Sequence, residues 1–534
     1  MKRIPTRFTA GSICAAMLLL VNLACAAQTV RTDKGLVEGV PASDPAVTVF
    51  RGIPYAAPPV GNLRWSAPQP AHPWQGVLHA DRFSRSCMQA APSSMAPWTE
   101  EYMDQNERSE DCLYLNVWTT GTTGKRPVMV WIHGGGFEQG STSVALYDGQ
   151  ELARKGIVVV SMNYRLGVFG FFALPQLTSE SPDHASGNYG ILDQIAALKW
   201  VHDNIAAFGG DPAQVTIAGQ SAGAMSVQIL TASPLARGLF HRAIAESGWG
   251  AGAMTRSLAD VEAEGTKFMA AKGAATLKEL RAMPVYLLMA PVPGETYRWG
   301  PAVDGWMLPE RVSAIYAQGR QNDVATMAGW CADEGSPFPK YGKLTPAEFA
   351  AEVRQPIGSG RALFFGLAPA GDLADEFLKL YPNATQEESS QSQKESIRDQ
   401  NMISTFVWAT ERSLHARTPV YTYLWDHPLP GPDSERYGSF HSAELPYVFD
   451  SLADVKRPWT QKDHSIAETT SSYWANFVKT GNPNGDNLPN WPVFNPGHAV
   501  TMELGDHFGV RPIATPAQVK LLEEIRARTV SAPK

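Results

Sequence analysis

The stretch that most constrains the fold of this 534-residue chain is the segment 215–226, VTIAGQSAGAMS. Its β-branched start is typical of a strand, and it then reaches Gly219-Gln220-Ser221-Ala222-Gly223. A serine at the centre of a G-x-S-x-G turn adopts strained backbone angles, and the two glycines let the strand and the following helix pass closely. The segment therefore predicts a nucleophilic Ser221 between a strand and a helix. The alternative is a glycine-rich turn in which Ser221 only caps the helix.

Further apolar runs predict the sheet to which this strand belongs. We expect strands over 113–118, 127–132, 156–162, 215–218, 324–329 and 420–425. A run that is apolar throughout, such as 127–132, predicts a strand buried on both faces of a parallel sheet. Helical spacing over 190–207 and a helix over 222–230 complete the order strand, helix, strand, helix. This order predicts a doubly wound α/β fold, preceded by small antiparallel edge strands within 29–50.

The remaining periodic segments predict helices with a structural role rather than a catalytic one. Two helices are expected within 258–288, and one each over 472–479 and 516–528. The polar segment 384–398 is interpreted as a solvated connection or the start of a helix.

Three successive glycines follow the apolar run 127–132, in the sequence HGGGF at 133–137. Their backbone N–H groups can point into a cavity, and this pattern predicts an oxyanion hole that includes Gly135 and Gly136. A helix that begins at Ala222 directs its unpaired N–H groups and its positive dipole end toward Ser221, so Ala222 is a third candidate donor. The alternative is a flexible loop.

A serine hydroxyl needs an imidazole to accept its proton and a carboxylate to hold the imidazole tautomer. In this fold class the chain order is serine, acid, histidine. Two adjacent carboxylates, Asp333 and Glu334, follow the strand at 324–329, and the residues alone do not choose between them. His441 is favoured as the base because it lies on a Gly- and Ser-rich turn after a strand, while His427 also lies near a strand end. The other histidines considered are His415, His464, His498 and His507.

The first 27 residues have the features of a secretory signal peptide. Three basic residues precede an apolar run over 13–24 that is too short to span a bilayer, and small residues follow at 24–27. We expect cleavage after residue 26 or 27 and a secreted or periplasmic mature chain. Lipidation of Cys25 is the alternative, but Asn22 stands where a lipoprotein signal has an aliphatic residue.

The net charge of the chain indicates which classes of binding partner are unfavourable. Removal of residues 1–27 takes away three basic and no acidic side chains, so the formal net charge changes from −7 to −10. An acidic chain disfavours nucleic acid and anionic membrane surfaces. No later segment has the length and apolar continuity of a membrane helix, so stable membrane insertion is not expected.

Cysteine usage predicts one disulfide. Of five cysteines, Cys87, Cys112 and Cys331 lie beyond the predicted signal. In an oxidising compartment Cys87 and Cys112 are the natural pair, and their bond stabilises the fold by about 3 kcal/mol in the chain-entropy model. Cys331 remains as a buried or idle thiol. The chain has no C-x-x-C or H-x-x-x-H spacing, and we predict neither a metal site nor a cofactor.

Eight segments of the chain, from about residue 35 to residue 494, occur in the order FRGIPYAAPPVGNLRW, SEDCLYLNVW, VMVWIHGGGF, GNYGILDQIAALKWVHDNIAAFGGDP, VTIAGQSAG, RAIAESG, DEG and FHSAELPYVF. As a set they resemble the type-B carboxylesterases, the family of α/β-hydrolases that includes the cholinesterases. The resemblance implies an α/β-hydrolase fold with a mostly parallel central sheet flanked by helices. It also implies a single catalytic domain over 28–534 after the signal peptide.

The resemblance assigns roles to individual residues. It implies a catalytic triad of Ser221, Glu334 and His441. It further implies the oxyanion donors Gly135, Gly136 and Ala222, support of the triad acid by Ser247, the disulfide Cys87–Cys112, and a structural ion pair between Arg64 and Glu110. The family usually has a glutamate before the nucleophile, where this chain has Gln220, so a buried charge is missing here.

Other departures concern the substrate. Cholinesterases bind a cation with a tryptophan in the first disulfide loop and an aromatic residue just past the DEG acid. Here Trp98 lies in the loop at a longer spacing from Glu110, and Pro337 stands at the second position, which argues against choline specificity. The later disulfides of animal members are absent, and this absence and the style of the signal indicate a bacterial secreted enzyme.

The resulting expectation is a secreted serine carboxylesterase that cleaves small-molecule esters through an acyl-enzyme. We expect the loops 88–108 and 287–311 to wall its pocket, although 88–108 could instead be a flexible cover. One alternative function is a non-catalytic binding or adhesion member of the same fold, although such members usually lose the serine or the histidine and this chain keeps both. Another is an esterase with amide or carbamate activity. No oligomeric state is predicted.

Overall fold

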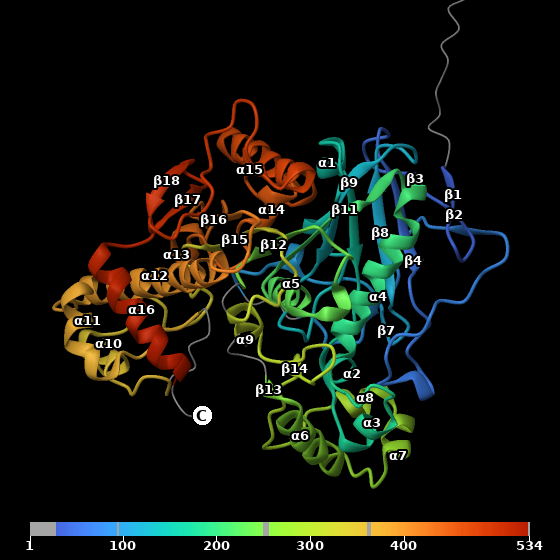
Figure 1. Cartoon of the computed structure of the whole chain (residues 1–534), viewed down its shortest axis with the longest axis horizontal. Helices are drawn as coiled ribbons and strands as arrows, with labels where there is room; N and C mark the ends of the chain where they lie inside the picture. Colours follow the sequence, from blue (N-terminus) through green and yellow to red (C-terminus); the bar gives the residue numbers. More distant parts are fainter. Residues whose placement is uncertain (1–27, 93–95, 249–255, 360–364, 532–534) are drawn as a thin grey trace, which may run out of the picture.

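The computed structural model describes residues 28–92, 96–248, 256–359 and 365–531. The predicted signal peptide at 1–27, with Cys25, lies outside the described residues. Figure 1 shows a central sheet with helices on both sides and two helical lobes at the periphery.

Eleven strands of the described chain form the central sheet. In spatial order they are β18 (Gly509–Pro512), β17 (Val500–Leu504), β16 (Val420–Trp425), β15 (Ala325–Cys331), β12 (Arg242–Glu246), β11 (Gly210–Gln220), β9 (Arg126–Ile132), β10 (Val158–Met162), β8 (Tyr114–Thr119), β4 (Thr48–Pro54) and β3 (Val40–Pro41). The seven strands from β17 to β10 pair in parallel, and the strands beyond each end pair antiparallel. The predicted, mostly parallel sheet is confirmed.

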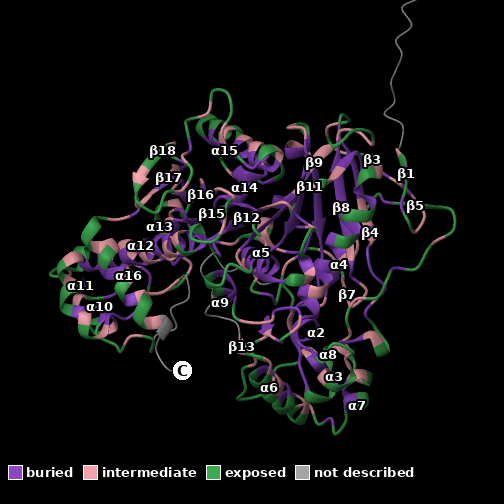
Figure 2. Ribbon diagram, viewed as in Figure 1, coloured by how far each residue is buried: buried purple, intermediate pink, exposed green. Residues whose placement is uncertain are grey.

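The central strands are buried on both faces, as the continuous apolar runs predict (Figure 2). In β9, Val128 and Val130 join one apolar cluster, whereas Met129 and Trp131 join a second cluster on the opposite face. Successive side chains of a strand alternate between its faces, so a run without polar residues suits a strand covered by helices on both sides.

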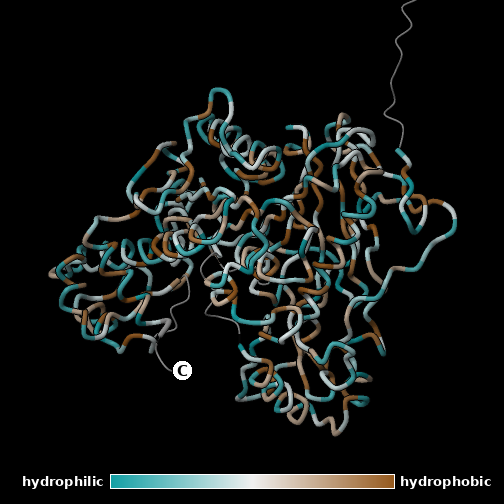
Figure 3. The backbone as a smooth tube through the Cα atoms, viewed as in Figure 1, coloured by the Kyte–Doolittle hydropathy of each residue, from teal (hydrophilic) through white to brown (hydrophobic). Residues whose placement is uncertain are grey.

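Different helices cover the two faces. The long helices α4 (Tyr189–Asn204) and α5 (Ala222–Ala232) contribute to the first cluster. The second cluster takes residues from α1 (Gln150–Arg154), α14 (Leu445–Val448) and α15 (Gln461–Thr480). In α15 the buried residues Ile466, Tyr473, Trp474 and Phe477 recur at helical spacing. Figure 3 shows hydrophilic and hydrophobic residues interspersed along the tube. This helix is longer than the predicted 472–479.

The N-terminal strands divide between two sheets. β1 (Thr29–Arg31) and β2 (Leu36–Glu38) pair antiparallel, as expected, and β5 (Val77–His79) adds to β2 in parallel. β3 and β4 instead extend the large sheet. The small sheet therefore stands beside the edge of the large one.

The peripheral lobes contain more helix than the sequence predicts. The segment 258–288 forms three helices, α6 (Leu258–Ala271), α7 (Leu277–Ala282) and α8 (Val285–Met289), where two are predicted. The polar segment 384–398 is the first half of α12 (Gln386–Ser413), which starts with a capping box between Thr385 and Glu388. Together α12, α10 (Pro346–Val353), α11 (Ala374–Leu380) and α16 (Pro516–Ser531) surround a separate apolar cluster. None of the described helices combines the length and apolar character needed to span a bilayer.

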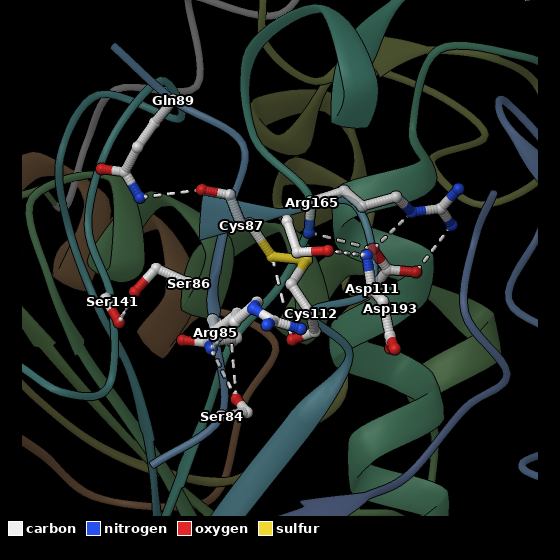
Figure 4. Close-up of a disulfide and its surroundings, with 12 residues drawn as sticks. Ser84, Arg85, Ser86, Cys87, Gln89, Asp111, Cys112, Ser141, Arg165 and Asp193 are labelled. Atoms are coloured by element: carbon white, nitrogen blue, oxygen red, sulfur yellow. Dashed lines mark hydrogen bonds and ion pairs between the residues drawn. A yellow bond between two sulfur atoms is a disulfide. The ribbon is translucent and has the colours of Figure 1, made fainter. Parts of the chain in front are cut away.

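A disulfide joins Cys87 and Cys112, as predicted (Figure 4). We call residues 88–111 between them the disulfide loop. The ion pair implied by the resemblance is also present, because Arg64 donates from Nε to Oε1 of Glu110 at 2.6 Å. Figure 4 shows a second buried pair close to the disulfide, in which Arg165 donates to Asp193 from both Nε and Nη2, at 2.8 and 2.7 Å. The Arg64–Glu110 pair fastens the end of the disulfide loop to the preceding segment, whereas Arg165 and Asp193 both lie outside the loop.

Candidate active site

A cavity of about 430 Å³ lies at the carboxyl ends of the central strands. Ser221, Gly135, Gly136 and His441 all line it. They come from the ends of β11 and β9 and from the segment after β16, so the sheet brings residues that are hundreds of positions apart around one space. Crevices at the carboxyl ends of parallel strands are the usual ligand sites of doubly wound sheets.

Ser221 lies on the sharp turn between β11 and α5. Its backbone has φ +56° and ψ −122°, a left-handed φ that a non-glycine residue rarely adopts. The flanking glycines explain how the turn fits: a Cβ at Gly219 would lie 2.6 Å from the carbonyl carbon of Gly223, and one at Gly223 would lie 2.0 Å from the oxygen of Ile132. The Ser221 side chain makes no capping hydrogen bond to α5, contrary to the alternative reading of this turn.

The loop after β9 is held in place by its neighbours. Gly135 and Gly136 have φ +105° and +67°, and a Cβ at Gly135 would lie 2.0 Å from the Gln139 oxygen. His133 donates from Nδ1 to the Gly134 oxygen at 2.8 Å and stacks on Tyr164 with 4.5 Å between ring centroids. Burial lowers the pKa of His133 to about 4, so this histidine is neutral and serves the loop's structure.

The backbone N–H groups of Gly135, Gly136 and Ala222 donate to no acceptor within the described part of the chain. Gly135 and Gly136 line the cavity, and Ala222 is the first residue of α5, whose positive dipole end adjoins Ser221. Such groups are suited to bind an oxygen that carries developing negative charge.

The imidazole of His441 contacts a buried carboxylate. Its Nδ1 lies 2.5 Å from Oε2 of Glu334. The other oxygen, Oε1, accepts hydrogen bonds from Oγ of Ser247 at 2.5 Å and from the N–H of Cys331 at 2.8 Å. Asp333 points elsewhere and accepts from Tyr341 Oη at 2.9 Å. Of the two adjacent acids that residue spacing left open, Glu334, the acid implied by the resemblance, is the one that contacts His441.

The second ring nitrogen of His441 faces the turn at Ser221. Its Nε2 lies 3.2 Å from Nε2 of Gln220, whose amide can only donate there. His441 therefore carries its proton on Nδ1, toward Glu334, and its Nε2 lone pair accepts from the Gln220 amide. The Ser221 hydroxyl has no hydrogen-bond partner among the described residues; in enzymes such contacts often tighten only in the substrate complex.

His427, the alternative base, lies in a different environment. Its Nδ1 is 2.7 Å from Asp506 and its Nε2 is 3.1 Å from Asp463, and it does not line the cavity. Asp463 also accepts from Tyr447 at 2.7 Å. Both ring nitrogens of His427 are thus occupied by structural contacts.

The cavity wall differs in part from the prediction. The disulfide loop supplies described wall residues, as expected, and they are Gln89, Pro92, Trp98, Tyr102, Met103 and Asp104. The loop 287–311, predicted as the second wall, contributes no described residue. Phe338 and Phe365 line that space instead, and only Phe338, in the segment after DEG, lies close to a motif that could have indicated it. Loop contacts of this kind depend on tertiary placement and leave no local pattern.

No group of three or more His, Cys, Asp or Glu side chains in the described ranges is arranged to hold a metal ion. The site consists of a serine on a strained turn, a histidine against a buried carboxylate, and unengaged backbone donors. This arrangement can activate a hydroxyl without a cofactor.

Comparison with known proteins agrees with this geometry. The family model described as "Carboxylesterase family" matches residues 26–521. The chain belongs to the carboxylesterase family. It is 34% identical over 504 residues to a fumonisin B1 esterase of Sphingopyxis macrogoltabida, covering 90% of this chain and 88% of the relative. It is 36% identical over 488 residues to a para-nitrobenzyl esterase of Bacillus subtilis (strain 168), covering 88% of this chain and 93% of the relative.

Membership confirms the fold and the class of reaction predicted from the eight segments. The carboxylesterase has the α/β-hydrolase fold, with the large mixed sheet and flanking helices described above, and it hydrolyses carboxylic esters.

Proposed function

We propose that this carboxylesterase is a secreted serine hydrolase that cleaves small-molecule esters through an acyl-enzyme, with Ser221, Glu334 and His441 as its triad. The proposal includes one catalytic domain over 28–534 behind a signal peptide at 1–27. A disulfide and the absence of a spanning helix from the described residues are compatible with secretion.

In the proposed reaction, Oγ of Ser221 bonds to the ester carbonyl carbon while its proton passes to Nε2 of His441. The carbonyl oxygen gains negative charge against the N–H groups of Gly135, Gly136 and Ala222. The bond to the alcohol oxygen then breaks, and the imidazolium returns its proton to the departing alcohol. Water attacks the acyl-enzyme by the same route and releases the acid.

In this proposal Glu334 and Ser247 orient the imidazole of His441. Glu334 would keep the imidazole in its Nδ1–H tautomer and stabilise the imidazolium, while Ser247 orients the carboxylate. The observation that carries the proposal is that Ser221 and His441 line one cavity while His441 contacts Glu334 at 2.5 Å.

The cavity wall favours uncharged substrates. Among its described residues Asp104 is the one with a formal charge, and the rest are largely aromatic, apolar or amide side chains. A carboxylate on the substrate would lose hydration without gaining a cation, whereas an aromatic ester can pack on the rings. Because one relative is a para-nitrobenzyl esterase, para-nitrobenzyl and para-nitrophenyl esters are the first substrates to test.

The test compares Ser221→Ala and His441→Ala with His427→Gln. We expect the first two to lower kcat by roughly 10⁴-fold or more with folding unchanged, as for other triad deletions. His427→Gln, which alters a histidine outside the cavity, should retain turnover. Wild-type turnover by Ser221→Ala would end the proposal.

A fluorophosphonate probe separates the alternatives. Covalent labelling of the wild type at Ser221 excludes a non-catalytic binding protein, and no labelling would favour one. Parallel rates on matched aryl esters, anilides and carbamates decide whether the ester is the preferred bond.

A further inference from the structure

Two side chains of the disulfide loop hold the backbone beside His441. We define the histidine loop as residues 438–444, between α13 (Ser434–Tyr437) and α14. The indole Nε1 of Trp98 donates to the carbonyl oxygen of His441 at 3.0 Å. The hydroxyl of Tyr102 donates to the carbonyl oxygen of Ser442 at 3.1 Å. Consecutive carbonyls of one loop are thus fixed from a segment more than 300 positions away.

The histidine loop needs such support because its backbone is strained. Ser442 has φ +84°, a left-handed value that is unfavourable for a residue with a side chain. Residues in such conformations persist only when their surroundings hold them. The carbonyl that Tyr102 binds belongs to this strained residue, directly after His441.

Ring contacts act on the same loop. The Trp98 ring meets the His441 ring edge to face, with centroids 6.3 Å apart, and Phe365 approaches the imidazole at 4.9 Å. Tyr102 packs against Phe440 at 5.9 Å. The imidazole is therefore confined between aromatic rings while its two nitrogens face Glu334 and Gln220.

The disulfide loop is itself anchored around these two residues. Glu101 accepts from Nε of Arg457 at 2.8 Å, and Thr99 accepts from Nη2 of Arg457 at 3.0 Å. Asp104 accepts from Oγ of Ser86 at 2.6 Å. The Cys87–Cys112 bond closes the loop behind them. Trp98 and Tyr102 thus project from a fastened segment, which a flexible cover would not provide.

We propose that Trp98 and Tyr102 are positioning residues for His441. They hold the histidine loop so that Nε2 stays at the turn of Gln220 and Ser221, in the cavity that His441 and Ser221 share. This proposal rests on the proposed function, and it gives the tryptophan of the disulfide loop a task other than cation binding. The Trp98 indole N–H donates to the His441 carbonyl oxygen, and the Trp98 ring lies nearly perpendicular to the imidazole.

The test uses Trp98→Phe and Tyr102→Phe, which keep a ring at each position and remove one donor. We expect kcat on a para-nitrophenyl ester to fall roughly five- to twentyfold in each, with KM changed less than about twofold, because a hydrogen bond that serves geometry acts on the chemical step. The rate of fluorophosphonate labelling should fall in the same proportion. The downfield NMR signal of the proton between His441 and Glu334 should shift or broaden.

Matched controls remove comparable bonds far from the base. Trp74→Phe loses an indole bond to the Leu36 oxygen of 2.8 Å, and Tyr473→Phe loses a hydroxyl bond to the Pro489 oxygen of 2.6 Å. Both should retain wild-type kcat and the wild-type NMR signal. If Trp98→Phe folds poorly, as its Tm would reveal, Tyr102→Phe decides alone.

The outcomes distinguish this proposal from the triad. A wild type that the probe does not label, or an active Ser221→Ala, overturns the proposed function. If the probe labels the wild type but kcat and the NMR signal are unchanged in Trp98→Phe and Tyr102→Phe, only the positioning role is overturned. If these variants raise KM and leave kcat unchanged, the two residues serve only as part of the cavity wall.

Discussion

The thiol of Cys331 donates a hydrogen bond to the carboxyl group of Glu444, with Sγ 3.0 Å from Oε2. The backbone N–H of the same cysteine donates to Glu334 at 2.8 Å. One residue at the end of β15 therefore links two buried glutamates, of which only Glu334 contacts His441. Burial raises the pKa of the Cys331 thiol well above its ordinary value, so it remains a donor. The cysteine that the sequence left without a role supports the carboxylates around His441.

Glu444 predicts a pH dependence of stability. Burial, reinforced by the nearby charge of Glu334, raises the pKa of Glu444 to about 7. The folded protein therefore keeps a proton that the unfolded chain has lost, so this group's contribution is complete below the unfolded pKa and disappears as the pH rises through 7. Glu444→Gln should be more stable than wild type by up to about 3 kcal/mol at pH 8, with little difference near pH 4.

Guanidine unfolding at both pH values measures this difference. The exposed Glu435→Gln is the control and should show the same stability relative to wild type at each pH. An advantage of Glu444→Gln that does not depend on pH would contradict the prediction.

Gln220 predicts a change in the pH profile of catalysis. Its side chain is buried and its amide donates to Nε2 of His441. A carboxylate in its place could only accept, which favours the protonated over the neutral imidazole. In Gln220→Glu we expect the acid limb of kcat/KM to move to higher pH by about one unit. As a control, Gln139→Glu adds the same charge to the cavity wall at an exposed residue and should shift the acid limb of kcat/KM less. An equal shift in both variants would show that the effect does not depend on contact between residue 220 and His441.

The close packing around Gly223 leaves no room for a side chain at this position of the turn. A Cβ there would lie 2.0 Å from the Ile132 oxygen, so Gly223→Ala must displace the end of β9 and the glycine loop that follows it. We expect a loss of stability of about 3 kcal/mol and loss of most activity. Thermal unfolding and ester turnover measure both. Gly509→Ala, whose Cβ would meet no heavy atom within 4 Å, should behave as wild type.

We expect loss of the disulfide to lower both the stability and the turnover of the enzyme. Cys87 and Cys112 are 25 positions apart, and the paired substitution C87S/C112S should lower the free energy of unfolding by about 3 kcal/mol in the chain-entropy model. Because Trp98 and Tyr102 lie in this loop, kcat should fall as well. A reductant should lower both the stability and the kcat of the wild type and should not change the double variant. A lower Tm with an unchanged kcat would show that the disulfide does not support the position of the histidine loop.

Much of the fold could be read from local patterns. The run at 127–132 predicts a strand covered on both faces, and β9 places Val130 and Trp131 in opposite clusters. The glycines around Ser221 predict a strand and a helix in close contact, and the distances at Gly219 and Gly223 agree. Element lengths were less predictable: α15 and α12 extend well beyond their predicted ranges because buried tertiary contacts, rather than propensity, decide where a helix ends.

The sequence by itself determined the succession of strands and helices along the chain around Ser221, the strained turn and the glycine loop, because each depends on the chemistry of neighbouring residues. Residue spacing left Asp333 and Glu334 open and the family resemblance favoured Glu334, which the tertiary structure places in contact with His441. Only the tertiary structure decided that Phe338 and Phe365 rather than the loop 287–311 wall the cavity. It also decided that Trp98 meets the histidine loop. These contacts join residues far apart in the chain, and which way a side chain on a loop points is set by the surfaces that close around it.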